Sequence, residues 1–224
     1  MNLSARLRCA ADLVRSGAKT VDIGTDHAYL PAYLVLSGRV DSAIACDIGE
    51  GPLANARETV KALGLDGKID LRLSDGLSAV KSSEADDICI CGMGGELIAQ
   101  IIDSTEWLKD PKKHLILQPM TAVDDLRIFL AGNGFCVTEE KLIKDAGRIY
   151  CIMSAQFGGK TASYTPEYPY IGNISADTEI GREYITKQLV RINKHINMLS
   201  KAADKTDIPR LTEIKKLIEK RLGD

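Results

Sequence analysis

The sequence predicts an α/β protein, in which an open, doubly wound sheet is followed by an antiparallel helical hairpin. Apolar strand-like runs alternate with stretches of helical periodicity in β–α steps up to about residue 131. Two longer strand-like runs, residues 135–144 and 148–157, then meet at a short turn, as a closing antiparallel pair does. From residue 176 onward, apolar side chains recur at spacings of three and four, which is typical of paired helices.

Each element of the sheet follows from a local pattern. The predicted strands are residues 20–24, 42–48, 69–73, 87–91 and 114–118. Helices are predicted over residues 4–14, about 28–37, from 51 onward, after the fourth strand, and over about 122–131. Ser4 is a candidate N-cap of the first helix, and Pro31 stands in a first turn, where proline is tolerated. Pro119 is expected to end the fifth strand, because proline lacks the N–H that a strand ladder uses.

Composition narrows the class of protein. The 224 residues, 45% of them apolar, are enough for one large domain or for one domain with an appendage. A net charge of −2 gives no global signature of nucleic-acid binding. The six cysteines lie mostly in apolar runs without metal-ligand spacing, which predicts reduced core thiols, no metal and a cytoplasmic protein. The sequence has no signal-peptide or membrane-spanning pattern, so no membrane association is expected.

Residues able to bind a ligand follow four of the predicted strands. In doubly wound sheets, ligands bind outside the carboxyl ends of the strands. The first turn offers a glycine that lets a ligand approach the backbone, and the second strand ends in an acid at roughly the spacing of a ribose-binding carboxylate. The pattern predicts a nucleoside-containing cofactor held by Asp22, Gly24, Thr25, Asp26, His27, Asp47, Ile48, Asp75, Gly76, Gly92 and Met93.

The first turn also favours one class of cofactor. A dinucleotide site usually shows three spaced glycines that cradle a pyrophosphate. Here Gly24 is soon followed by Asp26, whose carboxylate would repel a pyrophosphate and suits a cationic ligand. S-adenosyl-L-methionine carries a sulfonium and an ammonium group but no phosphate, so we expect it to be the cofactor.

Five motifs occur together and in order. They are Asp26-His27-Ala28-Tyr29-Leu30-Pro31, Gly51-Pro52, Asp75-Gly76-Leu77, Gly92-Met93-Gly94-Gly95 and Leu117-Gln118-Pro119. On these motifs the chain resembles the bacterial tRNA (adenine-N1)-methyltransferases, which modify adenine 22 in the D-arm of tRNA. The resemblance implies a Rossmann-like, seven-stranded class I methyltransferase domain over residues 1–158 and a linker with a helical coiled-coil domain over residues 159–224. The family often has Glu in place of Asp47 and commonly Asn in place of Met120, so no polar substrate contact is assigned to position 120.

The C-terminal segment is open to two interpretations. Its predicted apolar seam is Ile185, Leu189, Ile192, Ile196, Leu199 and Ala203, with a second helix from about Pro209. Residues 176–224 hold 11 Lys and Arg against 8 Asp and Glu, whereas the rest of the chain is net acidic. The basic excess favours contact with tRNA phosphates. A stabilising or dimerising appendage is the alternative, so the sequence is compatible with a monomer or a homodimer.

The expected reaction is in-line transfer of a methyl group to adenine N1, whose lone pair needs no prior deprotonation. N1 lies on the Watson–Crick edge, so we expect the adenine to be flipped out. Asp26 is the candidate carboxylate that stabilises the developing positive charge, and His27 is the second candidate catalytic residue. Two alternatives stay open: a methyltransferase acting on a small molecule or another RNA, and a non-catalytic nucleotide-binding module.

Overall fold

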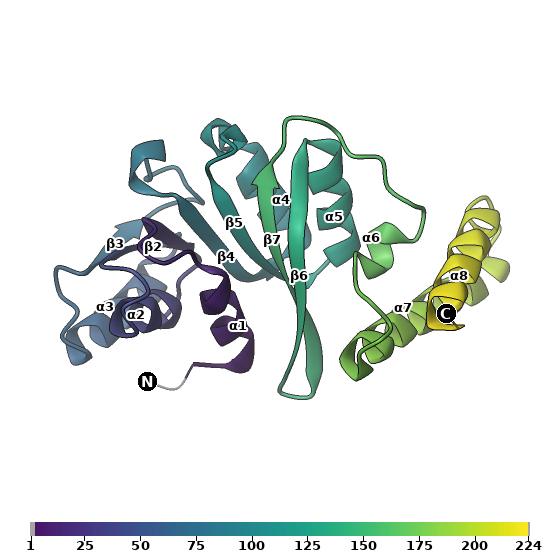
Figure 1. Ribbon diagram of the computed structural model, residues 1–224, viewed down its shortest axis with the longest axis horizontal. Helices are drawn as coiled ribbons and strands as arrows, with labels where there is room; N and C mark the ends of the chain where they lie inside the picture. The colour runs from purple at the N-terminus through teal and green to yellow at the C-terminus, as the bar shows by residue number, and fades with distance from the viewer. Residues whose placement is uncertain (1–2, 224) are drawn as a thin grey trace. The chain divides into compact units, whose positions relative to one another are not determined.

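The computed structural model describes residues 3–223. The chain divides into two compact units, with the boundary between Ala162 and Ser163. The first unit holds a twisted sheet flanked by helices, and the second is helical (Figure 1).

The sheet of the first unit has seven strands in the order β3-β2-β1-β4-β5-β7-β6. Its parallel strands are β1 (Thr20–Ile23), β2 (Ala43–Asp47), β3 (Ile69–Leu73), β4 (Asp87–Gly94) and β5 (His114–Thr121). Strand β7 (Arg148–Phe157) runs antiparallel to both β5 and β6 (Phe135–Asp145). The predicted doubly wound fold is therefore confirmed. The strand order reverses between β1 and β4, the place where such sheets bind their ligands.

Helices flank both faces of this sheet. They are α1 (Ala5–Leu13), α2 (Tyr29–Leu36), α3 (Glu50–Ala62), α4 (Gly95–Asp103) and α5 (Val123–Gly132), with short 3-10 helices at Ser82–Glu84 and Glu106–Lys109. Successive side chains of a strand point to opposite faces. Ile88 and Ile90 accordingly join the apolar core with α4 and α5, while Cys89 joins the core with α1 and α2. Both faces are filled by apolar side chains, so the polar groups gather at the strand ends.

The ends of β4 and β5 differ from the prediction. Pro119 does not end β5, because the strand continues to Thr121 alongside an equally extended β4. Met93 pairs with Pro119, and Gly94 pairs with Thr121, on either side of register shifts. A proline is tolerated at such an irregularity because the regular hydrogen-bond ladder is interrupted there. As a result, Gly92 and Met93 belong to a strand and not to a loop.

The second unit is a helical hairpin. It contains the short helix α6 (Tyr168–Ile171) and the long helices α7 (Glu179–Ser200) and α8 (Ile208–Gly223), which pack against each other. The two long helices bury Ile185, Ile192, Leu211, Ile214 and Ile218. Ala203 was predicted to belong to the seam but lies in the turn beyond α7, because that helix ends at Ser200.

Candidate functional site

The turn after β1 is tightly held to the end of β2. The N–H groups of Gly24 and Thr25 both donate to the carbonyl of Cys46, at 2.9 and 3.0 Å. Gly24 and Asp26 have positive φ angles of 71° and 51°, so the chain turns twice through the left-handed region. The N–H of Asp26 donates to Asp47 Oδ2 at 3.1 Å. The turn therefore brings the predicted residues of β1 and β2 into direct contact.

Asp22 lies beneath this turn and is almost completely buried. Its Oδ2 accepts a hydrogen bond of 2.7 Å from the Thr25 hydroxyl. Burial away from water raises the pKa of Asp22 to about 7, because the ionised carboxylate loses its solvation. Asp22 is thus a proton-accepting group near neutral pH within reach of the turn.

Asp47 uses both carboxylate oxygens to organise the neighbouring backbone. Oδ2 accepts from the N–H of Asp26, and Oδ1 accepts from the N–H of Gly49 at 3.0 Å. The next side chain, Ile48, is 70% exposed, which is unusual for an isoleucine. An oriented carboxylate beside an exposed apolar side chain suits a ligand with a polar sugar and a flat ring.

Position 24 favours glycine because of its positive φ of 71°, and its neighbour on β4 lies close beside it. A Cβ atom at this position would overlap Cε of Met93. Gly92, also on β4, has a φ of 83°, and a Cβ placed there would lie 3.5 Å from Nη1 of Arg6. At both glycines a side chain from elsewhere in the fold, Met93 or Arg6, lies against the main chain because no Cβ is present. A ligand could approach the backbone closely at these glycines once the long, flexible Met93 and Arg6 side chains move.

A cavity of about 400 Å³ opens beside the turn. It is lined by Asp22, Gly24, Thr25, Asp26, His27, Tyr29 and Leu30 from the β1–α2 segment, by Leu3, Ser4, Arg6 and Leu7 from the N-terminal segment, and by Cys91 of β4. The structure thus brings together the predicted residues after β1. Four predicted residues do not line this cavity: Asp47, Ile48, Gly92 and Met93. Asp75 and Gly76 line a separate hollow beside α4.

The N-terminal contribution to the cavity was missed from the sequence. Arg6 and Leu7 look like ordinary members of an amphipathic helix, and no local signal shows that this helix packs on the sheet face beside β4 and β5. Tyr29 was noted only as part of a motif. Its ring stacks on that of His27, with centroids 5.1 Å apart and planes 8° apart.

The candidate catalytic pair lies at the outer rim of the cavity. His27 Nε2 is 3.7 Å from Asp26 Oδ2, and these side chains are 40% and 63% exposed, respectively. Water screens a charge in such a position. Asp26 can therefore act strongly on a reacting group only if the substrate itself covers the rim.

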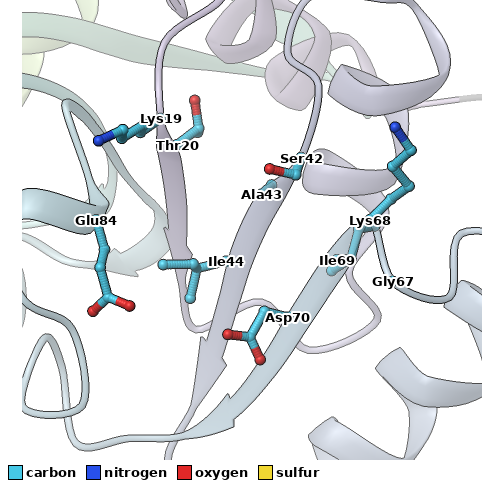
Figure 2. A pocket seen from close by; sticks show the side chains of 10 residues that line it. All are labelled: Lys19, Thr20, Ser42, Ala43, Ile44, Gly67, Lys68, Ile69, Asp70 and Glu84. Atoms are coloured by element: carbon cyan, nitrogen blue, oxygen red, sulfur yellow. The ribbon is translucent and has the colours of Figure 1, made fainter.

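A third hollow, of about 540 Å³, lies at the other end of the strands (Figure 2). Thr20 and Ala43, which begin β1 and β2, line it together with Glu84 and Asp70. Its two carboxylates are already paired with Arg72, at 2.7 and 2.8 Å. It is larger than the cavity beside the turn, but it lies at the amino ends of the strands, so we do not consider it the active site.

Within residues 3–223, no group of three or more His, Cys, Asp or Glu side chains is placed to hold a metal ion. No helix in the same range combines the length and apolar character of a membrane span.

Comparisons with known proteins agree on one family. A family model described as a methyltransferase domain matches residues 3–153. The tRNA (adenine(22)-N(1))-methyltransferase of Bacillus subtilis is 38% identical over 164 residues, which cover 73% of this chain and 69% of that protein. The crystal structure of the B. subtilis tRNA methyltransferase TrmK has a TM-score of 0.86 at 31% identity, covering 99% of both chains. Streptococcus pneumoniae Sp1610 in complex with S-adenosyl-L-methionine has a TM-score of 0.80 at 33% identity, covering 99% of this chain and 100% of that chain.

Proposed function

The chain belongs to the tRNA (adenine(22)-N1)-methyltransferase family, and we propose that it transfers a methyl group from S-adenosyl-L-methionine to N1 of adenine 22 in tRNA. The observation that carries this proposal is the glycine turn after β1, which brings Asp22, Asp26 and Asp47 together. Three carboxyl groups and no cradle of glycines suit a cationic nucleoside cofactor and not a dinucleotide.

The residues of the turn fit this cofactor on structural grounds. Each carboxylate oxygen has two acceptor sites. Because each oxygen of Asp47 accepts one backbone N–H, both can still accept from the hydroxyls of a ribose. We assign Ile48 to the face of the cofactor's adenine ring, and Asp75 and Gly76 to the edge of that ring. The amino-acid end of the cofactor is assigned to Gly24, Thr25, Gly92 and Met93. Glycine at position 24 adds no side chain of its own, so only the flexible Met93 side chain has to move for a ligand to approach this backbone.

The chain itself contributes positioning and charge to the reaction. When bound, S-adenosyl-L-methionine supplies an electrophilic methyl group. The enzyme must hold the flipped adenine in line with that group, and its neutral N1 needs no base to remove a proton. The exposed, stacked rings of His27 and Tyr29 stand at the rim where such a base would enter.

Asp26 is the proposed electrostatic partner of the adenine. The ring gains a positive charge as its N1 is methylated, and a carboxylate nearby stabilises that charge. Asp26 is exposed in the free protein, so its effect grows when RNA covers the rim and displaces water. His27, 3.7 Å from this carboxylate, is proposed to orient it.

We propose that the unit ending at Ala162 is the methyltransferase domain and that α7 and α8 contact tRNA. The basic excess of residues 176–224 supports this second assignment, because contacts with phosphates need cationic side chains. Since tRNA is its substrate, we also propose that the protein acts in the cytoplasm.

The test is transfer of a labelled methyl group to purified tRNA, followed by identification of the modified nucleoside. We expect 1-methyladenosine in a transcript with adenine 22 and none when guanine replaces that adenine. Label in another nucleoside, equal label in both transcripts, or binding of the cofactor without transfer to any RNA would contradict the proposal.

A further inference from the structure

Arg6 places a cation at the inner wall of the cavity. It lies in the first turn of α1, and its guanidinium Nη1 donates to Gln118 Oε1 at 2.7 Å. The same guanidinium faces the bare backbone of Gly92 on β4. The N–H of Arg6 also donates to Asp145 Oδ2 at 3.3 Å, which ties this turn of α1 to the end of β6.

Gln118 fixes the guanidinium in this position. It is fully buried on β5, and its Nε2 donates to the carbonyl of Pro119 at 3.0 Å and to Sδ of Met120 at 3.4 Å. These bonds orient its amide oxygen toward Arg6. A guanidinium has five N–H donors. Within residues 3–223, the Arg6 guanidinium has this one side-chain acceptor and no ion-pair partner, so most of its donors remain available.

The cavity therefore carries both signs of charge. Arg6 is the one Lys or Arg among its described lining residues, and Asp22 and Asp26 line it as well. Positive and negative groups in a space of about 400 Å³ complement a zwitterion. The amino-acid end of S-adenosyl-L-methionine is such a zwitterion, with an ammonium and a carboxylate on one carbon.

We propose that Arg6 binds the α-carboxylate of S-adenosyl-L-methionine, an inference that rests on the proposed function. A guanidinium recognises a carboxylate through two parallel N–H donors, which a single lysine ammonium cannot reproduce. The contact joins the cofactor to α1, so the N-terminal helix completes the cofactor site. Arg6 is then a binding residue for the cofactor and not for the RNA.

The test combines a variant of the protein with a variant of the ligand. Calorimetry would measure the affinity of the full-length protein for S-adenosylhomocysteine and for its decarboxylated counterpart, 5′-(3-aminopropylthio)-5′-deoxyadenosine. Arg6→Gln is expected to lower the affinity for S-adenosylhomocysteine by about 10- to 100-fold, the usual effect of losing hydrogen bonds to a charged group. The affinity for the decarboxylated ligand should stay within about 2-fold of the wild-type value, because that ligand has no carboxylate for Arg6 to contact. Arg6→Lys keeps the charge and should weaken S-adenosylhomocysteine less than Arg6→Gln does.

Arg8→Gln is the matched control. Arg8 lies on the same helix, but its guanidinium packs over the ring of Tyr33 at 5.3 Å and does not line the cavity. We expect this variant to bind both ligands as the wild type does.

Three outcomes would overturn the proposal. If Arg6→Gln weakens both ligands equally, the residue only holds α1 in place. If S-adenosylhomocysteine binds the variant normally while the KM for tRNA rises, Arg6 contacts an RNA phosphate instead. If the wild-type protein binds neither ligand, the proposed function fails as well, and this result is distinct from the first two because it does not depend on Arg6.

Discussion

Replacing Asp26 by Asn separates the charge of this residue from its backbone conformation. Asp26 has a φ of 51°, and Asn is, like Asp, one of the few residues that tolerate this region. The N–H that donates to Asp47 is retained in the variant. The side chain is exposed, so the free energy of unfolding should change by no more than about 0.5 kcal/mol. Only the negative charge at the rim of the cavity is lost.

The expected loss is in the methyl-transfer step. Deleting one preorganised electrostatic partner of a transition state typically costs about 10²–10³ in rate, or roughly 3–4 kcal/mol. We expect a loss of about this size in the single-turnover rate of Asp26→Asn on tRNA at saturating S-adenosyl-L-methionine. Asp26→Ala should lose the same activity and also about 1 kcal/mol of stability, because alanine is strained at positive φ. Thermal unfolding would distinguish the two variants.

The control is Asp66→Asn, which removes an exposed carboxylate before β3, at the other end of the strands from the turn. It should methylate at the wild-type rate. Methylation by Asp26→Asn at nearly that rate would refute the electrostatic role. A collapse of S-adenosylhomocysteine affinity with an unchanged saturated rate would instead make Asp26 a ligand of the cofactor.

Three further predictions concern the cofactor, pH and the second unit. Gly24→Ala should destabilise the protein by about 1–2 kcal/mol, because alanine is strained at a φ of 71°. It should also weaken the binding of S-adenosylhomocysteine at least about 10-fold in calorimetry, because the new methyl group stands where the ligand approaches the backbone. Asp22 has a pKa of about 7 against 3.8 for an ordinary Asp, so the folded state holds this proton more tightly than the unfolded state does. The free energy of unfolding should therefore fall by up to about 4 kcal/mol as pH rises from about 4 to 7, and Asp22→Asn should flatten that slope in denaturant titrations. A chain ending at Ala162 should keep its affinity for S-adenosylhomocysteine within about 2-fold and bind tRNA at least about 10-fold more weakly; unchanged tRNA binding would favour a purely structural hairpin.

The architecture could be predicted because its signals are local. The β–α alternation and the paired run at the end of the sheet are visible as periodicity, and the structure confirms all seven strands. The rule that ligands bind at the carboxyl ends of strands then selected Asp22, Asp26 and Asp47, which the structure connects through the turn. The same rule could not tell which residues share one wall, since Asp75 lies beside a different hollow.

What the sequence did not show depends on contacts between distant segments. Pro119 was expected to end a strand because proline lacks an N–H, but its pairing with β4 contains an irregularity that accommodates it. Arg127 and Glu140 have the composition of a solvated surface, yet their side chains are 0% and 2% exposed and form an ion pair of 2.8 Å between α5 and β6. Arg6 reaches the cavity only because α1 packs on one face of the sheet, where Arg6 meets Gln118 of β5. Each is a tertiary effect that no local pattern encodes.

The open rim of the cavity also bears on the class of substrate. A methyltransferase for a small molecule has to exclude water with its own chain, since a screened carboxylate does little for a developing charge. Here Asp26 and His27 remain exposed at the rim of the cavity. When the base belongs to a large RNA, the RNA itself excludes water from the site, because the surrounding ribose-phosphate chain displaces water as the adenine enters. The exposure of Asp26 is therefore consistent with a site whose catalytic environment is completed by tRNA, and this favours tRNA over a free nucleoside as the substrate.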